Sequence, residues 1–171
     1  LGWLSFTVET DPVRLWVSPS SAAAQEKDFF DQSFGPFYRA EQAFLVNNRP
    51  ENDSRPLLDY ETLTWWFDVE SRVRRVISLD QALNFDDVCF KPTGEACVVQ
   101  SVTGYFGGSV SNLDPDTWKD RLSHCTESPG DPSCLPDFSQ PLKPEMILGG
   151  YEDTGDILDA QALIATWVVN N

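Results

Sequence analysis

The sequence predicts an α+β fold, with helices packed on a mainly antiparallel sheet. Segments with strand-like and helix-like hydrophobic spacing follow one another in the order strand, helix, strand, helices, strand, strand. The 171 residues are 41% hydrophobic and 12% aromatic, which is enough for a real core in the size range of a single domain. The four cysteines form two close pairs, Cys89/Cys97 and Cys125/Cys134. We therefore expect residues 1–171 to form one domain.

The N-terminal part predicts a strand, a helix and a second strand. Apolar and polar residues alternate through about Trp3–Glu9, and Asp11-Pro12 ends this strand. Ser18-Pro19 predicts the start of a helix, because it offers a capping hydroxyl and a proline at the first helical position. Gly35-Pro36 predicts the end of this helix. Alternation returns from Phe37 to Val46. The residues on one side of this second strand are Tyr38, Ala40, Phe44 and Val46.

The middle part predicts helices joined by turns. Residues 47–58 form an exposed loop by composition, and Asp59 can cap a long helix. The apolar residues that recur in this helix at steps of three and four are Leu63, Trp66, Val69, Val73 and Val76. The segment Cys89–Cys97 indicates a stapled turn, and Val98–Phe106 a short helix that Gly107-Gly108 ends.

The C-terminal part predicts a helix and two strands. A second exposed loop covers roughly residues 107–113, and Asp114-Pro115 then starts a helix. The residues that share one face of this helix are Trp118, Leu122 and Cys125. Met146–Tyr151 has the pattern of a strand, and Ala160–Val169 is apolar on both faces, which indicates a central strand.

Disulfides are the preferred interpretation of the cysteines. Zinc binding is the rival interpretation, but neither pair has the two-residue gap of a zinc knuckle, and the only histidine, His124, stands directly beside Cys125. Loop-closure entropy favours local pairing, Cys89 with Cys97 and Cys125 with Cys134. Disulfides indicate an oxidising compartment, and the glycosylation sequon at Asn52 agrees with a luminal location. We expect no metal and no cofactor.

The net charge of the chain limits the classes of partner that it can bind. The net charge is −15, from 27 acidic and 12 basic residues. A phosphate backbone would be repelled, so nucleic-acid binding is excluded and an anionic membrane surface is disfavoured. The acidity serves solubility, or it suits an acidic compartment in which some carboxylates are protonated. No apolar run is long enough to span a bilayer, and both ends have strand-like patterns, so we expect the chain to be part of a longer protein.

The sequence offers little for catalysis. His124 is the only histidine, and neither Gly107-Gly108 nor Gly149-Gly150 has the further residues of a phosphate-binding loop. Paired carboxylates remain as an option, because a glycosidase needs only two. The adjacent or nearby pairs are Asp86/Asp87, Asp114/Asp116 and Glu152/Asp153. All lie in turn-like contexts where acids serve as caps, so we expect no enzyme and keep a secreted carboxylate-type hydrolase as a weaker alternative.

Several phrases of the sequence resemble one family. They are Glu9–Trp16, Glu26–Asp31, Phe34–Gln42, Leu148–Tyr151 and Val168–Asn171. In this order and spacing they resemble the middle luminal domain of the Niemann–Pick type C sterol transporters, in wording closer to fungal members. The resemblance spans nearly the whole chain, and the two cysteine pairs fall where the family places its two disulfides.

The resemblance implies a fold, a location and a role. The fold would be a ferredoxin-like α/β porter core with added helices, excised from a multi-pass membrane protein on the luminal side of the vacuole, lysosome or late endosome. The domain would dock a small soluble luminal sterol carrier, so that sterol, the cargo, passes to the other luminal and transmembrane domains of the same transporter. A direct sterol-binding domain is the alternative from a different functional class.

The resemblance also implies two docking loops, Asn47–Pro56 and Gly107–Asp116. The candidate contact residues are Asn48, Arg49, Pro50, Leu57, Gly108, Val110, Asn112 and Leu113. Val110 and Leu113 are the candidate apolar anchors, since an exposed apolar tip needs a partner; the alternative is that they pack under the loop. Trp118 is expected in the core, and a glycan on Asn52 would crowd the first loop.

Overall fold

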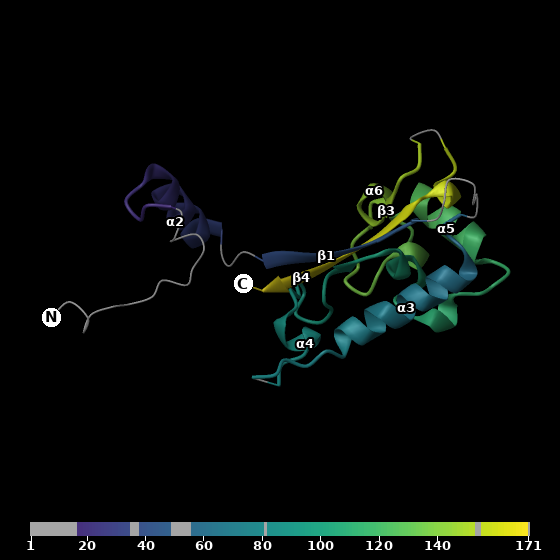
Figure 1. The fold of residues 1–171 in the computed structure, drawn as a ribbon, viewed down its shortest axis with the longest axis horizontal. Coiled ribbons are helices and arrows are strands. Elements are labelled where there is room, and N and C mark those ends of the chain that lie inside the picture. Colours follow the sequence, from purple (N-terminus) through teal and green to yellow (C-terminus); the bar gives the residue numbers. More distant parts are fainter. Residues whose placement is uncertain (1–16, 35–37, 49–55, 81, 153–154, 171) are drawn as a thin grey trace. The chain divides into compact units, whose positions relative to one another are not determined.

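The computed structural model describes residues 17–34, 38–48, 56–80, 82–152 and 155–170 (Figure 1). The chain divides into two compact units, residues 1–37 with residue 171, and residues 38–170. Each unit is described by itself. The strand predicted for about Trp3–Glu9 lies outside the described residues, so it stays a prediction.

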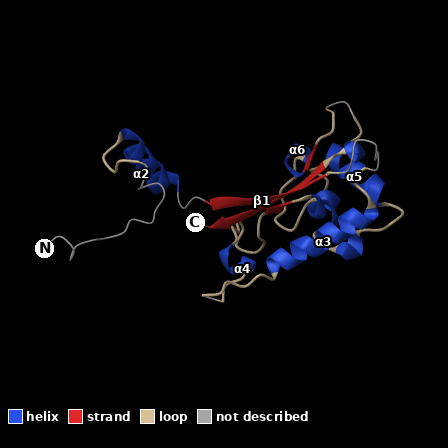
Figure 2. Cartoon of the chain, viewed as in Figure 1, coloured by secondary structure: helices blue, strands red, loops and turns tan. Residues whose placement is uncertain are grey.

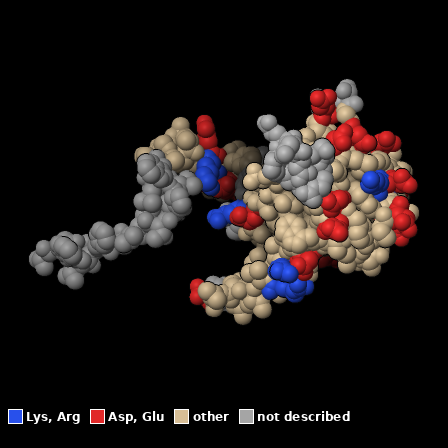
Figure 3. Space-filling model, turned by 45° about the vertical axis from the view of Figure 1, so that its right-hand side comes forward, with Lys and Arg blue, Asp and Glu red and all other residues tan. Residues whose placement is uncertain are grey.

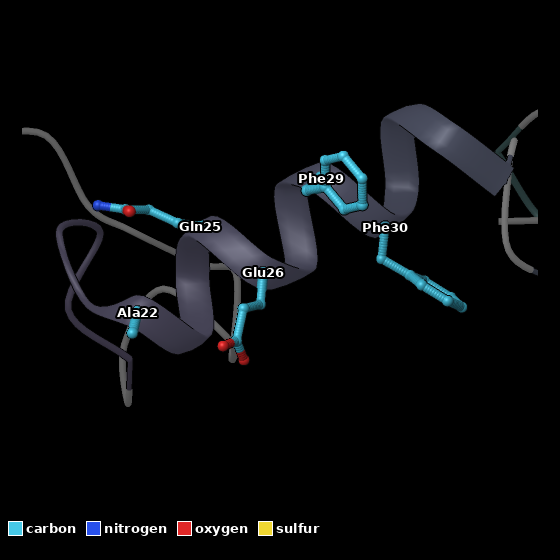
Figure 4. Close-up of a pocket in the computed structure, with 5 residues that line it drawn as sticks. All are labelled: Ala22, Gln25, Glu26, Phe29 and Phe30. Atoms are coloured by element: carbon cyan, nitrogen blue, oxygen red, sulfur yellow. The ribbon is translucent and has the colours of Figure 1, made fainter.

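Helix α2 (Ala22–Phe34) is the described element of the first unit. Its start lies a few residues later than Ser18-Pro19, because the Ser21 hydroxyl accepts a hydrogen bond from the Ala24 N–H at 3.2 Å and so caps the helix. Phe29 and Phe30 are both exposed. Figure 4 shows them with Ala22, Gln25 and Glu26 along this one helix, where they line a shallow, open hollow.

An antiparallel sheet organises the second unit (Figure 2). Its two long strands, β1 (Tyr38–Val46) and β4 (Ala162–Asn170), pair over nine residues with Ala43 opposite Ala165. Short strands β2 (Val99–Gln100) and β3 (Leu148–Gly149) also pair with β4. The central position predicted for the last strand is therefore confirmed. The side of β1 that carries Tyr38, Phe44 and Val46 is the exposed one.

The α-helices among the described residues of the second unit are α3 (Tyr60–Arg74), α4 (Phe85–Val88), α5 (Trp118–Glu127) and α6 (Pro144–Ile147). The Asp59 carboxylate accepts the Thr62 N–H at 2.6 Å and caps α3, as predicted. Leu63 and Trp66 are buried on its inner face. The helix ends at Arg74, so Val76 lies beyond it and is exposed.

Two predicted elements are shorter or different. The expected helix over Val98–Phe106 is strand β2 followed by a 3₁₀-helix, Val102–Phe106, because Val99 and Gln100 pair with β4 before the Ser101 side chain caps the turn. The expected strand over Met146–Tyr151 is reduced to β3, since Pro144 starts the short helix α6 directly before it.

Both predicted disulfides are confirmed, with Cα–Cα distances of 5.5 Å for Cys89–Cys97 and 5.3 Å for Cys125–Cys134. The core between helices and sheet is filled by fully buried side chains. The largest apolar ones are Tyr105, Phe106, Leu63, Leu122, Leu142, Ile147, Leu148 and Leu163. The fold is thus α+β, as predicted, and none of the helices in the described part of the chain is long and apolar enough to cross a membrane.

Candidate docking site

The base of the second loop is fixed in the core. All five residues of the 3₁₀-helix Val102–Phe106 are buried. Gly107 and Gly108 follow with φ angles of +61° and +64°, a backbone conformation that favours glycine, and they turn the chain outward. The Gly107 N–H donates to the Gly104 carbonyl and the Gly108 N–H to the Thr103 carbonyl, both at 3.0 Å. The loop therefore leaves the core at a defined angle.

The tip of the second loop separates the two candidate anchors. Residues Val110–Asn112 form a short 3₁₀ turn, and the Asn112 side-chain amide donates to the Phe106 carbonyl at 2.9 Å. Val110 is 49% exposed, as an anchor requires, whereas Leu113 is only 4% exposed. The expectation that Leu113 is an exposed anchor is corrected, because the turn directs its side chain into the core. Of the two apolar residues, Val110 alone is presented at the tip.

The segment after the tip is a turn that leads into α5, so the helix expected from Asp114-Pro115 begins later, at Trp118. The Asp114 carboxylate accepts the N–H groups of Asp116 and Thr117 at 2.9 and 3.0 Å. Trp118 is buried at the first position of α5, so its predicted core role is confirmed. Arg121 points back to the base of the loop, where its Nε donates to the Tyr105 carbonyl at 2.7 Å.

The first loop is described only at its two ends. Arg49, Pro50 and Asn52 lie outside the described residues, so their predicted roles stay untested. Asn48 is exposed, and its neighbour Asn47 donates from its backbone N–H to the Gln161 carbonyl at 2.9 Å. Leu57 is buried in the core, which corrects its place among exposed contact residues, because the chain turns inward there to start α3.

A groove lies beside the first loop, between the end of β1 and the start of α3. It has a volume of about 470 Å³ and is open to solvent. Its lining residues are Leu45, Val46, Asn47, Asn48, Leu57, Glu61, Thr62 and Trp65. Trp65 is 51% exposed, whereas Trp66, whose ring lies 6.0 Å away, is buried. Trp65 falls outside the apolar stripe Leu63–Trp66–Val69, and this was the available sequence signal that it faces outward.

The elements that flank the first loop and the helix that follows the second loop lie at one end of the second unit. Figure 1 shows the end of β1, the start of α3 and helix α5 at the end opposite to the start of β1 and the end of β4. Acidic residues surround the second loop, where Asp114, Asp116 and Asp120 are exposed. Figure 3 shows acidic side chains scattered over the face of the second unit that is turned forward in this view. The candidate site is therefore an apolar tip and an apolar groove within an acidic surface.

Several of the groups considered for catalysis make local structural hydrogen bonds. In α4, the Asp87 carboxylate accepts the Asn84 N–H at 2.9 Å while the Asn84 side chain accepts the Asp86 N–H, which forms a capping box. The Asp114 carboxylate holds the turn before α5, and Asp153 lies outside the described residues. His124 is exposed and lies 3.6 Å from Asp131. The sulfur of Cys134 beside this pair is in a disulfide, so it offers no thiolate for a metal ion.

The fold and this surface define a disulfide-linked α+β domain whose candidate site is suited to binding. Comparison with known proteins makes the assignment specific: the family model described as "NPC1, middle luminal domain" matches residues 27–171. The chain belongs to this family, as its resemblance had indicated.

Curated relatives agree with the family. The chain is 30% identical over 216 residues to "NPC1-like intracellular cholesterol transporter 1" of Mus musculus, an alignment that covers 100% of the chain and 16% of that protein. It is 31% identical over 207 residues to "NPC intracellular cholesterol transporter 1" of Sus scrofa, covering 99% of the chain and 16% of that protein. The chain thus spans about a sixth of the length of these relatives.

Proposed function

We infer that this chain is the luminal docking domain of a sterol transporter, and that it binds a small soluble luminal sterol carrier so that sterol can pass to the longer protein. Membership in the middle luminal domain family supports the luminal setting, and the names of the relatives support sterol as cargo. The observation that carries docking is the second loop, which is hydrogen-bonded to the buried 3₁₀-helix before it and presents Val110 exposed at its tip.

The chemistry of the surface suits a protein partner. Hot spots in protein interfaces are apolar or aromatic anchors enclosed by a polar rim, and Val110 and Trp65 have this setting among exposed carboxylates. A carrier with a basic rim around an apolar patch would match both features and would associate faster at low ionic strength. The proposal gives the chain a binding role and no reaction.

The setting of the domain follows from the same proposal. Residues 1–171 would be one middle luminal domain of a multi-pass protein in the membrane of a lysosome, late endosome or vacuole. Its other partners would be the remaining luminal and transmembrane domains of that protein. Two disulfides suit such an oxidising lumen.

Direct sterol binding is less well supported. A buried small-molecule site encloses most of the surface of its ligand. The groove beside Trp65 is open to solvent, and the hollow between Arg74, Thr103 and Phe138 holds only about 20 Å³. Neither hollow encloses a sterol.

A binding and transfer experiment tests the proposal. The chain is immobilised, and the soluble luminal sterol carrier encoded in the same genome is titrated over it at pH 5 and pH 7, with and without loaded sterol. We expect saturable binding of the carrier and no uptake of radiolabelled sterol by the chain alone. Sterol uptake without the carrier would favour the direct sterol-binding alternative, and no carrier binding at either pH would refute docking.

A further inference from the structure

A carboxylic side chain lies in the core, away from the docking surface. Glu70 is on the inner face of α3 and is only 5% exposed. Burial of a charged carboxylate is costly unless its charge is compensated or it takes up a proton. Glu70 has no part in the anchors described above, so its position requires another explanation.

Hydroxyl groups surround the Glu70 carboxyl. The Thr103 hydroxyl donates to one carboxyl oxygen at 2.7 Å, and the Ser101 hydroxyl donates to the other. The Trp66 indole N–H in turn donates to the Ser101 oxygen at 3.2 Å. A hydroxyl can donate to a carboxylate or accept from a carboxylic acid. These neighbours can therefore bond the carboxyl in either protonation state, but they supply no positive charge against the buried charge of an ionised Glu70.

The charges around Glu70 are few. Arg74, one turn later on α3, attracts the carboxylate, but its guanidinium also lies over the Phe85 ring at 5.7 Å. Asp86 and Asp87 of the neighbouring helix α4 are exposed, and Asp137 lines a small hollow together with Arg74 and Thr103. Burial raises the pKa of Glu70 above its ordinary value of 4.5; the hydroxyl donors and Arg74 oppose this rise without cancelling it.

The residues that hold Glu70 also hold the second loop. Thr103 donates its hydroxyl to Glu70, and its carbonyl accepts the N–H of Gly108, the second residue of the loop. Ser101 caps the 3₁₀-helix whose last carbonyl, that of Phe106, accepts the side-chain amide of Asn112 near the loop tip. Two or three bonds thus connect the buried carboxyl to the exposed tip.

We propose that Glu70 is a positioning residue for the second loop, and that its protonated form holds the Ser101–Phe106 segment on α3 while its ionised form loosens it. The order of the loop would then be greatest at the acidic pH of the compartment that the proposed function implies. The functional meaning of this control rests on that proposed function, but the change in loop order does not.

The direction of the pH effect follows from proton linkage. Because the folded pKa is raised, the folded state binds more protons than the unfolded state at pH values above 4.5. The contribution of Glu70 to stability is therefore full below pH 4.5 and is lost as the pH rises through the folded pKa.

Hydrogen exchange between pH 4.5 and 7.5, corrected for intrinsic exchange rates, tests the proposal on the 171-residue chain. We expect protection of the Gly107, Gly108 and Asn112 amides to fall with rising pH in the wild type. Glu70→Gln keeps a neutral group that can both donate and accept, so its protection should stay at the acidic level throughout. Glu127→Gln removes the same charge from an exposed site of α5 and should follow the wild type.

A second variant tests the role of the hydroxyl groups. Thr103→Val removes a donor to the carboxylate, so the midpoint of the pH profile should move to higher pH. The proposal is overturned if Glu70→Gln keeps the wild-type profile, or if Thr103→Val moves the midpoint down. If the profiles behave as expected but the soluble carrier binds at no pH, docking fails and the control of the loop by Glu70 stands.

Discussion

Two exposed apolar segments of the second unit differ in how they are anchored. The second loop presents one exposed apolar residue, Val110, and follows directly on the buried 3₁₀-helix Val102–Phe106. The segment between α3 and α4 exposes more apolar surface: Val76 is 65% exposed, Ile77 is similar, and Leu79 is fully exposed. That segment is closed by the Ser78 N–H, which donates to the Leu83 carbonyl at 2.8 Å, and by the Leu83 N–H, which donates to the Ser78 hydroxyl.

The difference indicates that exposed hydrophobicity alone does not define a docking site. A loop that must be ordered on binding costs free energy, whereas a loop fixed by the core has that order beforehand. The second loop has a buried leucine and two glycines in the left-handed region. A hydrogen bond from a side-chain amide also joins its tip to the Phe106 carbonyl at its base. The segment around Leu79, by contrast, has a fully exposed leucine.

The largest expected effect separates these two leucines. Leu113→Ala removes a buried side chain and should lower the free energy of unfolding by about 2–5 kcal/mol, whereas Leu79→Ala should change it by less than about 0.5 kcal/mol. Urea denaturation followed by tryptophan fluorescence measures both. Equal losses would show that the two segments are anchored alike.

A smaller effect is expected from the Cys125–Cys134 disulfide. Replacing Cys125 and Cys134 together by Ala should cost roughly 2–3 kcal/mol in the chain-entropy treatment of a short loop. It should also loosen the second loop, because Arg121 bonds both the Tyr105 carbonyl and the Ser133 carbonyl next to Cys134. Replacing Cys89 and Cys97 should cost a similar amount and leave the exchange of loop amides unchanged. Loop exchange that responds equally to both removals would contradict this assignment.

The hydrogen bond made by the Asn112 side-chain amide at the loop tip should contribute less to stability. Asn112→Ala removes the donor to the Phe106 carbonyl, which is part of a 3₁₀-helix end, and should cost about 0.5–1.5 kcal/mol. Ser111→Ala, one residue away, serves as the control and should cost less. Thermal denaturation measures both losses. A larger loss for Asn112→Ala than for Ser111→Ala supports the claim that this hydrogen bond fixes the tip.

The smallest expected effect is the pH dependence of stability that Asp131, outside the second loop, contributes. Hydrogen bonds from the Ser133 hydroxyl and N–H, and then the nearby His124, lower the pKa of Asp131 below its ordinary 3.8. Its contribution to stability is present above pH 3.8 and is lost as the pH falls through the folded pKa. Acid unfolding of Asp131→Asn should therefore be less steep below pH 4 than that of the wild type. Glu70 acts in the separate range above pH 4.5.

The sequence allowed much of this fold to be predicted, and little of the site. Periodicity located α3, which buries apolar side chains at helical spacing, and β4, whose apolar run is mostly buried. It also located β1 from the alternation of its residues, although none of them is fully buried. It could not separate Val110 from Leu113, since both are apolar and a single 3₁₀ turn decides which one is buried. The segment Val98–Phe106 before the second loop was expected as a helix. Its start pairs with β4 instead, Val99 with Trp167, and local spacing does not reveal such a long-range contact.

Glu70 shows a different limit. It lies four residues after Trp66 and seven after Leu63, and this spacing places it on the buried face of α3. In a chain with 27 acidic residues, this spacing alone does not distinguish Glu70 from a solvated carboxylate. Only the two hydroxyls from the Ser101–Phe106 segment, thirty residues later in the chain, explain why it is tolerated there.

The most direct test of the docking claim compares two valines. Val110→Asp and Val76→Asp place the same charge at exposed positions, one on the second loop and one on the segment after α3. The affinity of the soluble sterol carrier is measured for both at acidic pH by titration calorimetry, with circular dichroism as a check of folding. We expect Val110→Asp to cost about 1–2 kcal/mol, roughly five- to thirty-fold in affinity, and Val76→Asp to bind like the wild type. Wild-type affinity of Val110→Asp, or a larger loss for Val76→Asp, would contradict the account.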